Sequence, residues 1–286
     1  MSNRKARKAP GRFFFDLWRQ RIATPRMRVA SAPPAPAVAP IPAVIREPRV
    51  EPYCIGLAET DADRRAAFRL RFRVFNLEMK EGLDSSYQTG EDTDEFDSIC
   101  DHLIVRHGAT GEIVGTYRLQ TGNTAARNLG YYSAREFQFA SYEALRSQIV
   151  ELGRACIHPD HRKYEVLMKL WKGIVCYARQ RNASYLIGCS SISTEDQSVG
   201  SAMYENLKPM LVAQELRTVP QVGYDFPLTG QADNVSTPKL LRAYLSVGAR
   251  ICGPPALDRE FHTIDFLTLM DLNSLSPSVR SRFLQS

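Results

Sequence analysis

The sequence predicts an α/β fold in which a mixed β-sheet carries helices on both of its faces. Three observations support this prediction. From residue 51 onward, short runs rich in β-branched and aromatic residues alternate with longer runs of helical periodicity. Their order is β-α-β-β-αα-β-α-β-α-β, which mixes hairpin and helical connections. No segment matches the glycine-rich phosphate loops of dinucleotide or nucleoside triphosphate enzymes, which argues against those classes.

The first third of the fold is expected to contain a strand, a long helix and a hairpin. Residues 53–58 are predicted to form the strand. Thr60 or Asp61 can cap the helix, whose apolar stripes continue to about Met79. An acidic, loop-like stretch follows, and then two β-rich runs joined by Gly-Ala-Thr-Gly, which suits a turn. The two strands of this hairpin are residues 101–107 and 112–121.

The middle of the chain is expected to hold two short helices, a strand, a long helix and another strand. The short helices are predicted at residues 133–139 and 141–147. Residues 148–159 and 184–192 are apolar runs of strand length. Between them, residues 163–181 place apolar side chains on one face at helical spacing, which predicts an amphipathic helix.

The last part of the chain gives a weaker pattern. A helix is expected near residues 199–215. Residues 237–249 predict a further helix, with Pro238 in its first turn and Gly248 at its end. The final strand is expected at residues 261–272.

The charge is distributed unevenly along the chain. Of the formal net charge of +6, residues 1–50 contribute +9 from eleven basic and two acidic side chains, which leaves −3 for residues 51–286. The basic character thus belongs to a tail, and a nucleic-acid partner is not indicated. Residues 31–45 are rich in Pro and Ala, as in an unfolded spacer. We expect a disordered tail over 1–50 and one folded domain over 51–286.

The tail contains a segment with amphipathic character. If residues 12–22 form a helix, aromatic side chains share one face and arginines lie on the other, as at a membrane interface. A disordered tail or a docking segment is the alternative. No apolar run approaches the roughly 20 residues of a membrane span, and no secretory signal is recognisable. We expect a cytoplasmic protein that can lie peripherally at the inner membrane.

The stretch ELGRACIHPDHR (residues 151–162) places two opposite charges, Glu151 and Arg154, in an apolar strand. Each buried charge loses several kcal/mol of hydration, so such residues need a partner or a function. In a regular strand, residues three apart point to opposite faces. Gly153 between them can host a β-bulge that changes this. A plain ion pair at a sheet edge is the alternative to a catalytic role.

Several segments, taken in order, carry a resemblance to a known family. RFRVFNLEM, DTDEFDSICDHLIV, GEIVGTYRLQ and ELGRACIHPDHR resemble the acyl-homoserine-lactone-synthase-like branch of the GNAT superfamily. The region around ELGRACIHPDHR, together with PKLLRAYLSVGARICGPPALDREFHTIDFLTLMDL, is similar to the bacterial ornithine Nα-acyltransferases, whose relatives are often labelled hemolysin-like. The likeness covers roughly residues 53–275. It implies a GNAT-like mixed sheet, the acyl-CoA N-acyltransferase fold.

The resemblance also implies an activity. A fatty acyl group, typically 3-hydroxyacyl, would pass from acyl carrier protein to the α-amine of L-ornithine, the first step of ornithine lipid synthesis. No cofactor is implied beyond the phosphopantetheine thioester of the acyl carrier protein, which acts as a co-substrate. The implied partners are acyl carrier protein and ornithine, and the resemblance implies neither a metal nor a nucleic acid.

The family pattern maps onto catalytic residues Glu151 and Arg154 and onto a substrate-binding set. Glu151 is suited to accept the amine proton, directly or through a water, as general base. The aspartates of the set either contact the ornithine amines or hold the arginines in place, and Arg118 is a candidate partner for the ornithine carboxylate. The substrate-binding set is Arg73, Phe75, Asp94, Asp97 and Arg118.

The donor is expected to bind along the same strand and at the start of the next helix. Backbone N–H groups near Ala155 and Ile157 can stabilise an oxyanion, an effect often worth ~3 kcal/mol per donor. Arg162, Lys163 and the helix N-terminal amides near Tyr164 can hold one phosphate. The basic helix face beyond them is either a dock for acidic acyl carrier protein or an ordinary solvated surface.

Four alternatives remain at this stage. The acceptor can be another amino acid, such as glycine or lysine. The chain can be an acyl-homoserine-lactone-type synthase, or a non-catalytic module that binds acyl carrier protein or lipid. A covalent route through Cys156, with His158 two residues away, is also conceivable.

Overall fold

The computed structural model describes residues 51–229 and 235–284. They form an eight-stranded mixed sheet in the order β1-β2-β3-β4-β5-β8-β6, with β7 also paired to β8. The predicted mixed sheet is therefore confirmed. The strands are β1 (Tyr53–Leu57), β2 (Asp101–His107), β3 (Ile113–Thr121), β4 (Ile149–Ile157), β5 (Tyr185–Ile192), β6 (Arg250–Ile251), β7 (Ala256–Asp258) and β8 (Thr263–Asp271).

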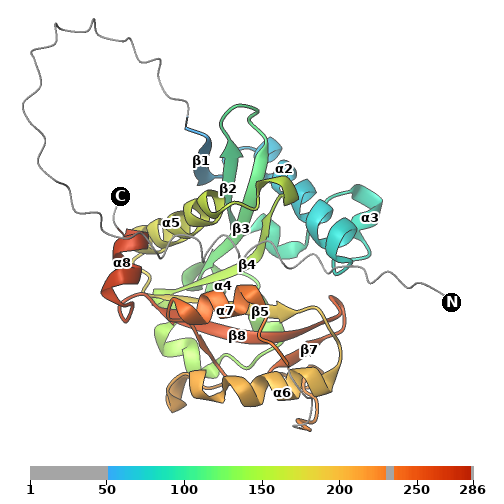
Figure 1. Cartoon of the computed structure of the whole chain (residues 1–286), viewed down its shortest axis with the longest axis vertical. Helices are drawn as coiled ribbons and strands as arrows, with labels where there is room; N and C mark the ends of the chain where they lie inside the picture. Colours follow the sequence, from blue (N-terminus) through green and yellow to red (C-terminus); the bar gives the residue numbers. More distant parts are fainter. Residues whose placement is uncertain (1–50, 230–234, 285–286) are drawn as a thin grey trace, which may run out of the picture.

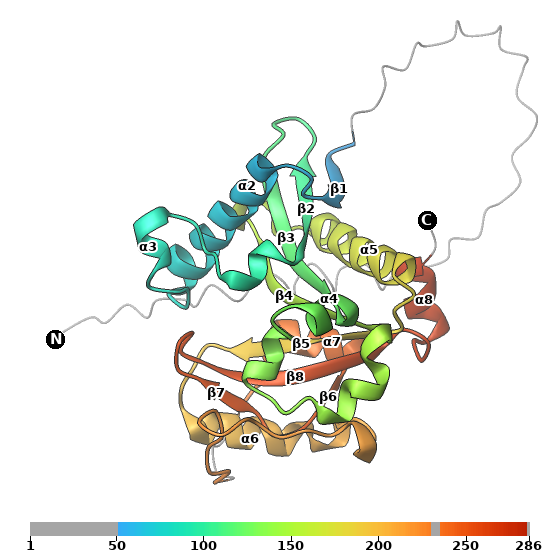
Figure 2. The same ribbon diagram turned by 180° about the vertical axis from the view of Figure 1, so that it is seen from behind.

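Helices flank the sheet on both sides (Figures 1 and 2). The α-helices are α2 (Asp61–Phe72), α3 (Ser86–Thr89), α4 (Gly122–Arg127), α5 (Tyr164–Gln180), α6 (Gln197–Leu207), α7 (Lys239–Ser246) and α8 (Pro277–Leu284). Shorter helical segments used below are η2 (Arg73–Met79, a π-helix), η3 (Glu95–Ser98), η4 (Tyr132–Arg135) and η5 (Ala140–Gln148).

In the first half of the sheet, α5 covers one face and α2 the opposite face (Figures 1 and 2). The alternation of side chains along β2 explains this arrangement. Leu103 and Val105 belong to the core cluster beneath α5, whereas Ile104 belongs to the cluster beneath α2. Because both faces are covered, the central strands are apolar on both sides.

The helical run that starts with α2 begins and ends close to the predicted residues. Thr60 caps it, with the hydroxyl accepting the backbone N–H of Asp63 at 3.1 Å. After Phe72 the helix continues as the π-helix η2, and Lys80, at a φ of 65°, ends it. The helical run therefore reaches Met79, as its apolar stripes predict. Single π-helical turns are often found beside functional sites.

The second half of the sheet is built on the long antiparallel pair β5 and β8, and α6 and α7 pack against it. The helix expected over 199–215 is shorter, because α6 ends at Leu207 and Pro209 follows in a 3₁₀ turn. Helices α3, α4 and α8 and strands β6 and β7 were not predicted from the sequence. Each is eight residues or fewer, too short for a periodic signal.

The two halves part between β4 and β5. These parallel strands pair only from Ile149 to Glu151, opposite Tyr185 to Ile187. The point of divergence is tight, because a Cβ atom at Gly188 would lie 2.3 Å from the carbonyl oxygen of Leu152. Beyond it, the β4 edge that faces β5 lacks strand pairing in the described part of the chain.

The predicted tail over 1–50 and the amphipathic helix over 12–22 lie outside the described residues. Within the described ranges, no helix combines the length and apolar character that crossing a membrane would require.

Candidate active site

A cavity of about 220 Å³ opens where β4 and β5 part. Its walls come from five strands, β3, β4, β5, β7 and β8, from the helical segments η2, η4 and α7, and from the loops beside them. Residues far apart in sequence meet here. Of the residues predicted from the sequence, five line it: Phe75, Arg118, Glu151, Arg154 and Ala155.

Glu151 lies in the wall of this cavity and is only 5% exposed. Its two carboxylate oxygens accept the backbone N–H groups of Tyr132 and Ser133, each at 2.8 Å. Burial raises the pKa of Glu151, and hydrogen bonds from Ser133 and Tyr132 oppose the rise. A carboxylate offers about four lone-pair sites, so these donors leave room for another one. The carboxylate is therefore fixed in place and still able to accept a proton from a ligand.

Strand β4 contains a β-bulge. Gly153 lies opposite Arg118 whereas Cys156 lies opposite Thr116, so β4 has one residue more than β3 across this interval. The backbone of Arg154 is left-handed, with a φ of 49°. A non-glycine residue in that conformation costs roughly 1–2 kcal/mol. The predicted bulge exists, but Arg154 and not Gly153 takes the unusual conformation.

The bulge brings Glu151 and Arg154 to the same face of β4. The contacts of Tyr132 show this directly: its N–H donates to Glu151, and its ring lies 5.4 Å from the Arg154 guanidinium carbon. The Arg118 guanidinium carbon lies 4.9 Å from the same ring. The short segment η4, which was predicted to start only at Ser133, thus organises the site.

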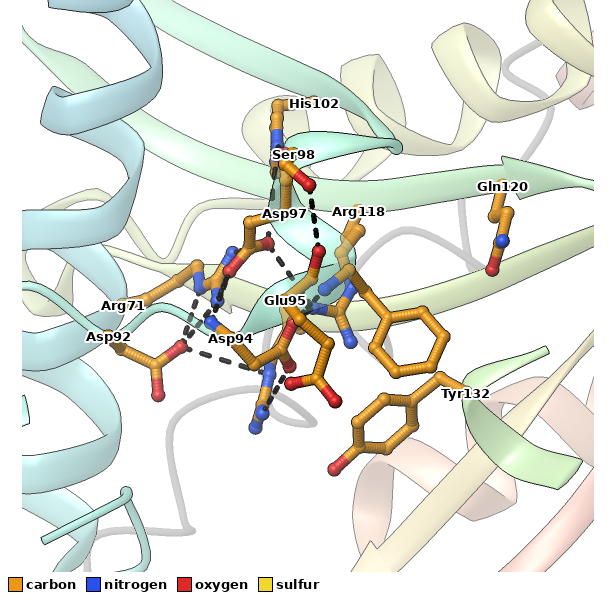
Figure 3. Close-up of polar contacts among 12 residues, drawn as sticks. Arg71, Asp92, Asp94, Glu95, Asp97, Ser98, His102, Arg118, Gln120 and Tyr132 are labelled. Atoms are coloured by element: carbon orange, nitrogen blue, oxygen red, sulfur yellow. Dashed lines mark hydrogen bonds and ion pairs between the residues drawn. The ribbon is translucent and has the colours of Figure 1, made fainter. Parts of the chain in front are cut away.

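Asp94 and Asp97 hold two arginines at the cavity wall (Figure 3). Asp94 accepts from Arg118 at 2.6 Å and from Arg154 at 3.0 Å, and Asp97 accepts from Arg118 at 3.2 Å. Burial alone would raise the pKa of both carboxyl groups, but the neighbouring arginines lower both pKa values. Of the two roles expected for these aspartates, the structure displays the positioning of arginines.

Arg71, and not Arg73, completes this network. Arg71 is 1% exposed and donates to Asp92 at 2.7 Å and to Asp97 at 2.7 and 2.8 Å (Figure 3). Arg73 is exposed. Side chains two positions apart on an α-helix point about 200° away from each other, so Arg71 and Arg73 cannot both face the sheet. The expected position of Arg73 at the site is therefore corrected in favour of Arg71.

The free edge of β4 presents backbone donors to the gap. His158 N–H donates to Val114 O of β3 at 2.8 Å. Because N–H groups alternate in direction along a regular antiparallel strand, that of Ile157 points away from β3. It is therefore directed at the side where pairing with β5 has ended. Ile157 is one of the two residues whose amides are expected to stabilise an oxyanion; the other, Ala155, lies at the bulge, where the regular alternation is interrupted.

The start of α5 differs from the expectation at one residue. Both terminal nitrogens of Arg162 donate to the carboxylate of Glu78 at 2.6 Å, so this arginine ties the loop before α5 to η2 and is not free for a phosphate. Lys163 is exposed, and no side chain caps the helix that begins at Tyr164. The first amides of α5 therefore lack an intrahelical partner, as in anion-binding helix termini.

The cysteines near the site are poor nucleophiles. Burial raises the pKa of Cys156, and burial together with nearby carboxylates raises the pKa of Cys189 well above its ordinary value. Both thiols are therefore protonated near neutral pH, whereas the thiolate is the reactive form. The raised thiol pKa values therefore do not favour the covalent route considered from the sequence.

Three buried carboxyl groups in the cavity wall were not identified from the sequence. Glu136, Asp258 and Asp265 are 2%, 5% and 4% exposed and come from the end of η4, from β7 and from β8. Burial and mutual repulsion raise the pKa of Glu136 well above its ordinary value and that of Asp265 to about 6. An acid inside the apolar run of β8 was the signal that could have identified Asp265, as it did Glu151.

Comparisons with known proteins show which family the chain resembles in sequence. A family model described as an acetyltransferase (GNAT) domain matches residues 70–172. The chain is 31% identical over 238 residues to an L-ornithine N(alpha)-acyltransferase of Agrobacterium fabrum (strain C58), covering 77% of this chain and 81% of that protein. It is also 31% identical over 241 residues to the L-ornithine N(alpha)-acyltransferase of Brucella abortus (strain 2308), covering 78% and 85%. Among solved structures, it is similar to the AHL synthase LasI, with 13% identity, coverage of 81% of this chain and 93% of that chain, and a TM-score of 0.48.

Proposed function

This chain belongs to the L-ornithine Nα-acyltransferase family, and we propose that it transfers a fatty acyl group from acyl carrier protein to the α-amine of L-ornithine. The product is an N-acylated ornithine, the first intermediate of ornithine lipid synthesis, and a 3-hydroxyacyl chain is the proposed donor group. One observation carries the proposal. A buried carboxylate, Glu151, lines a cavity that opens where β4 and β5 part.

In the proposed reaction, the α-amine of ornithine approaches Glu151 as an ammonium ion. Glu151 takes one proton, directly or through a water, because only the neutral amine can attack. The amine nitrogen then bonds to the thioester carbon, and the carbonyl oxygen becomes an oxyanion. When the intermediate collapses, the carbon–sulfur bond breaks, the amide forms, and the second amine proton passes to the leaving thiolate.

Backbone amides are proposed to stabilise the oxyanion. The N–H group of Ile157, which pairs in register with Gly115, is directed at the gap left by β5, and the N–H group of Ala155 at the bulge is proposed to act with it. Such preorganised donors are often worth ~3 kcal/mol each in the transition state. The donor thioester would then lie along the free edge of β4, in the place where a further strand would pair.

The carboxylate of ornithine is proposed to bind Arg118. One of its terminal nitrogens, Nη1, makes the bonds to Asp94 and Asp97, while a guanidinium carries five N–H donors in total. Arg118 lines the cavity and is only 4% exposed, so a charge-assisted bond there would be strong. The acyl chain is proposed to leave through the apolar side formed by Phe75, Met79 and Leu240.

Acyl carrier protein is the proposed donor protein. Its phosphopantetheine carries one phosphate, which the amides at the start of α5 and Lys163 are suited to bind. Acyl carrier proteins are acidic, so a cation at this entrance would favour encounter. The basic segment of residues 12–22 is proposed to bring the enzyme to the anionic inner membrane, where its lipid product accumulates.

Expression in a bacterial host that makes no ornithine lipid, followed by lipid mass spectrometry, tests the proposal. The wild-type chain should produce an N-acylated ornithine, and Glu151→Gln should produce little of it at equal protein level. An N-acylated glycine or lysine would correct the acceptor, and an acyl-homoserine lactone would correct the reaction. A non-catalytic binding module would yield no new lipid at all. Deletion of residues 1–45 tests the membrane proposal, since fractionation with membranes should then decrease.

A further inference from the structure

We propose that Glu136, Asp258 and Asp265 form the subsite that binds the side-chain ammonium group of the acceptor amino acid. The inference rests on the proposed function and goes beyond it, because it assigns selection of a diamino acid to residues outside the Glu151 and arginine network. The three acids come from three separate elements and meet in one wall of the cavity.

The charge of the cavity favours a cation at this wall. The arginines that line the cavity, Arg118 and Arg154, each form an ion pair with Asp94 and not with the acids of this wall. In contrast, the salt bridges among residues 51–229 and 235–284 include none made by Glu136 or Asp265. Ionised carboxylates held close together in a buried site repel one another strongly. A bound ammonium group would remove that repulsion.

Two oxygens at this wall are without partners. Asp265 Oδ1 and Thr263 Oγ1 have no hydrogen-bond partner among the described residues, and the residues are 4% and 3% exposed. Both residues line the cavity. Buried polar atoms are almost always paired, so unpaired acceptors in a cavity wall indicate a missing donor. An ammonium group offers three donors and no acceptor, which matches this wall.

The spacing along the sheet fits a diamino acid. Glu151 pairs in register with Ile187, and the next residue on the same face of β5 is Cys189. The thiol of Cys189 lies 3.7 Å from Glu136, and an oxygen of Asp265 lies within 4.8 Å of both groups. Two residues along a strand advance about 6.6 Å. The two nitrogens of extended ornithine are joined by five bonds of about 1.5 Å, so they lie about 6 Å apart.

Steady-state kinetics on the purified full-length protein test this subsite. L-norvaline is the informative acceptor, because it has the carbon skeleton of ornithine without the side-chain amine. Wild type should prefer L-ornithine over L-norvaline, and over the shorter 2,4-diaminobutyrate and the longer lysine. Glu136→Gln and Asp265→Asn should lower kcat/KM for ornithine about 10- to 100-fold, mainly through KM, while the low rate with norvaline stays unchanged or rises.

The same kinetic assay includes a control variant. Glu260→Gln, an equal charge change at an exposed neighbour of β7, should leave both acceptors unaffected. If the variants lose ornithine and norvaline activity equally, the acids have only a structural role and the inference is wrong. If wild type acylates none of these acceptors, the proposed function itself fails. One metal ion per chain by elemental analysis would also overturn the ammonium assignment.

A binding measurement on wild type keeps the inference testable if the variants do not fold. Calorimetric titration with L-ornithine near pH 6, in buffers of different ionisation enthalpy, should show proton release that norvaline does not cause. Burial and mutual repulsion raise the pKa of both Glu136 and Asp265, so a proton bound to these carboxyl groups should be released when an ammonium group binds beside them. Equal affinity for ornithine and norvaline, with no difference in proton release, would contradict the inference.

Discussion

Glu151 and Arg154 lie on the same face of β4, although three positions separate them. In a regular strand they would point apart, and only one could reach the cavity. The extra residue of the bulge turns the Arg154 side chain to the face on which Glu151 lies, so that the carboxylate and the guanidinium both contact Tyr132. The strained residue, Arg154, is itself one of the two residues predicted to be catalytic. The protein therefore holds an unfavourable backbone conformation at the point where it positions a charge.

Substitution of Arg154 separates the strain from the charge. Arg154→Ala should destabilise the fold by about 3–5 kcal/mol, because Asp94 and Asp92 lose a buried partner. Arg154→Gly loses the same partner but adopts a φ of 49° without strain. It should therefore be more stable than the alanine variant by about 1 kcal/mol. Urea unfolding of the two variants measures the difference, and equal midpoints would show that the bulge is not strained.

A matched pair on the first helical run tests the arginine network. Arg71→Ala removes three hydrogen bonds to buried aspartates and should cost about 3–5 kcal/mol of unfolding free energy. Arg73→Ala, two residues away, should change it by less than about 0.5 kcal/mol, because Arg73 is exposed. Chemical unfolding at pH 7 measures both values. A large loss for Arg73→Ala would mean that the helix is rotated relative to this structure.

The cavity-lining residues that could be predicted from the sequence are those in long regular elements. Glu151 and Arg154 stood out because charges are rare in an apolar strand, and the helix to Met79 followed from its stripes. Glu136 could not be identified from the sequence, because it follows a short 3₁₀ segment whose position depends on tertiary contacts. Arg73 was predicted at the site in place of Arg71 because the first helix carries apolar residues on more than one side. Which of its faces packs against the sheet is decided by tertiary contacts and not by the sequence pattern.

The donor entrance is expected to respond to charge reversal at Lys163. Lys163→Glu should raise the KM for acyl carrier protein roughly threefold to tenfold at low salt, with the KM for ornithine unchanged. The effect should fade at high ionic strength, because exposed charges are screened within about 10 Å at 0.1 M salt. The control is Lys208→Glu, because Lys208 directly follows α6 in the other half of the sheet. Equal effects of the two substitutions would place the dock elsewhere.

Removal of the Glu151 carboxylate should stop turnover without abolishing binding. Glu151→Gln should lower kcat at least about 100-fold, because an amide cannot accept the amine proton. In wild type, burial raises the pKa of Glu151, so activity should rise with pH above the ordinary carboxyl range. The variant should lack this rise. Glu143→Gln, an exposed acid paired with Arg146, should behave as wild type in the same kinetic assay. Full activity of Glu151→Gln would exclude this residue as the base.

The subsite formed by Glu136, Asp258 and Asp265 should lower the stability of the protein without ligand. The sign of the pH dependence follows from the pKa of Asp265. Burial raises the pKa of Asp265 from 3.8 to about 6, so the neutral form is favoured in the folded state. The contribution of this group to stability is therefore complete below pH 3.8 and is lost as the pH rises through 6.

Asp265→Asn keeps the group neutral and should remove that loss. Urea unfolding should show the variant more stable than wild type at pH 8, by up to about 3 kcal/mol, with a smaller difference at pH 5. Saturating L-ornithine should stabilise wild type at pH 8 more than it stabilises the variant, because only wild type gains a full ion pair. If Asp265→Asn is less stable than wild type at both pH values, the carboxylate is a structural group of the folded state. Its exposure to a cavity would then have no relation to the acceptor.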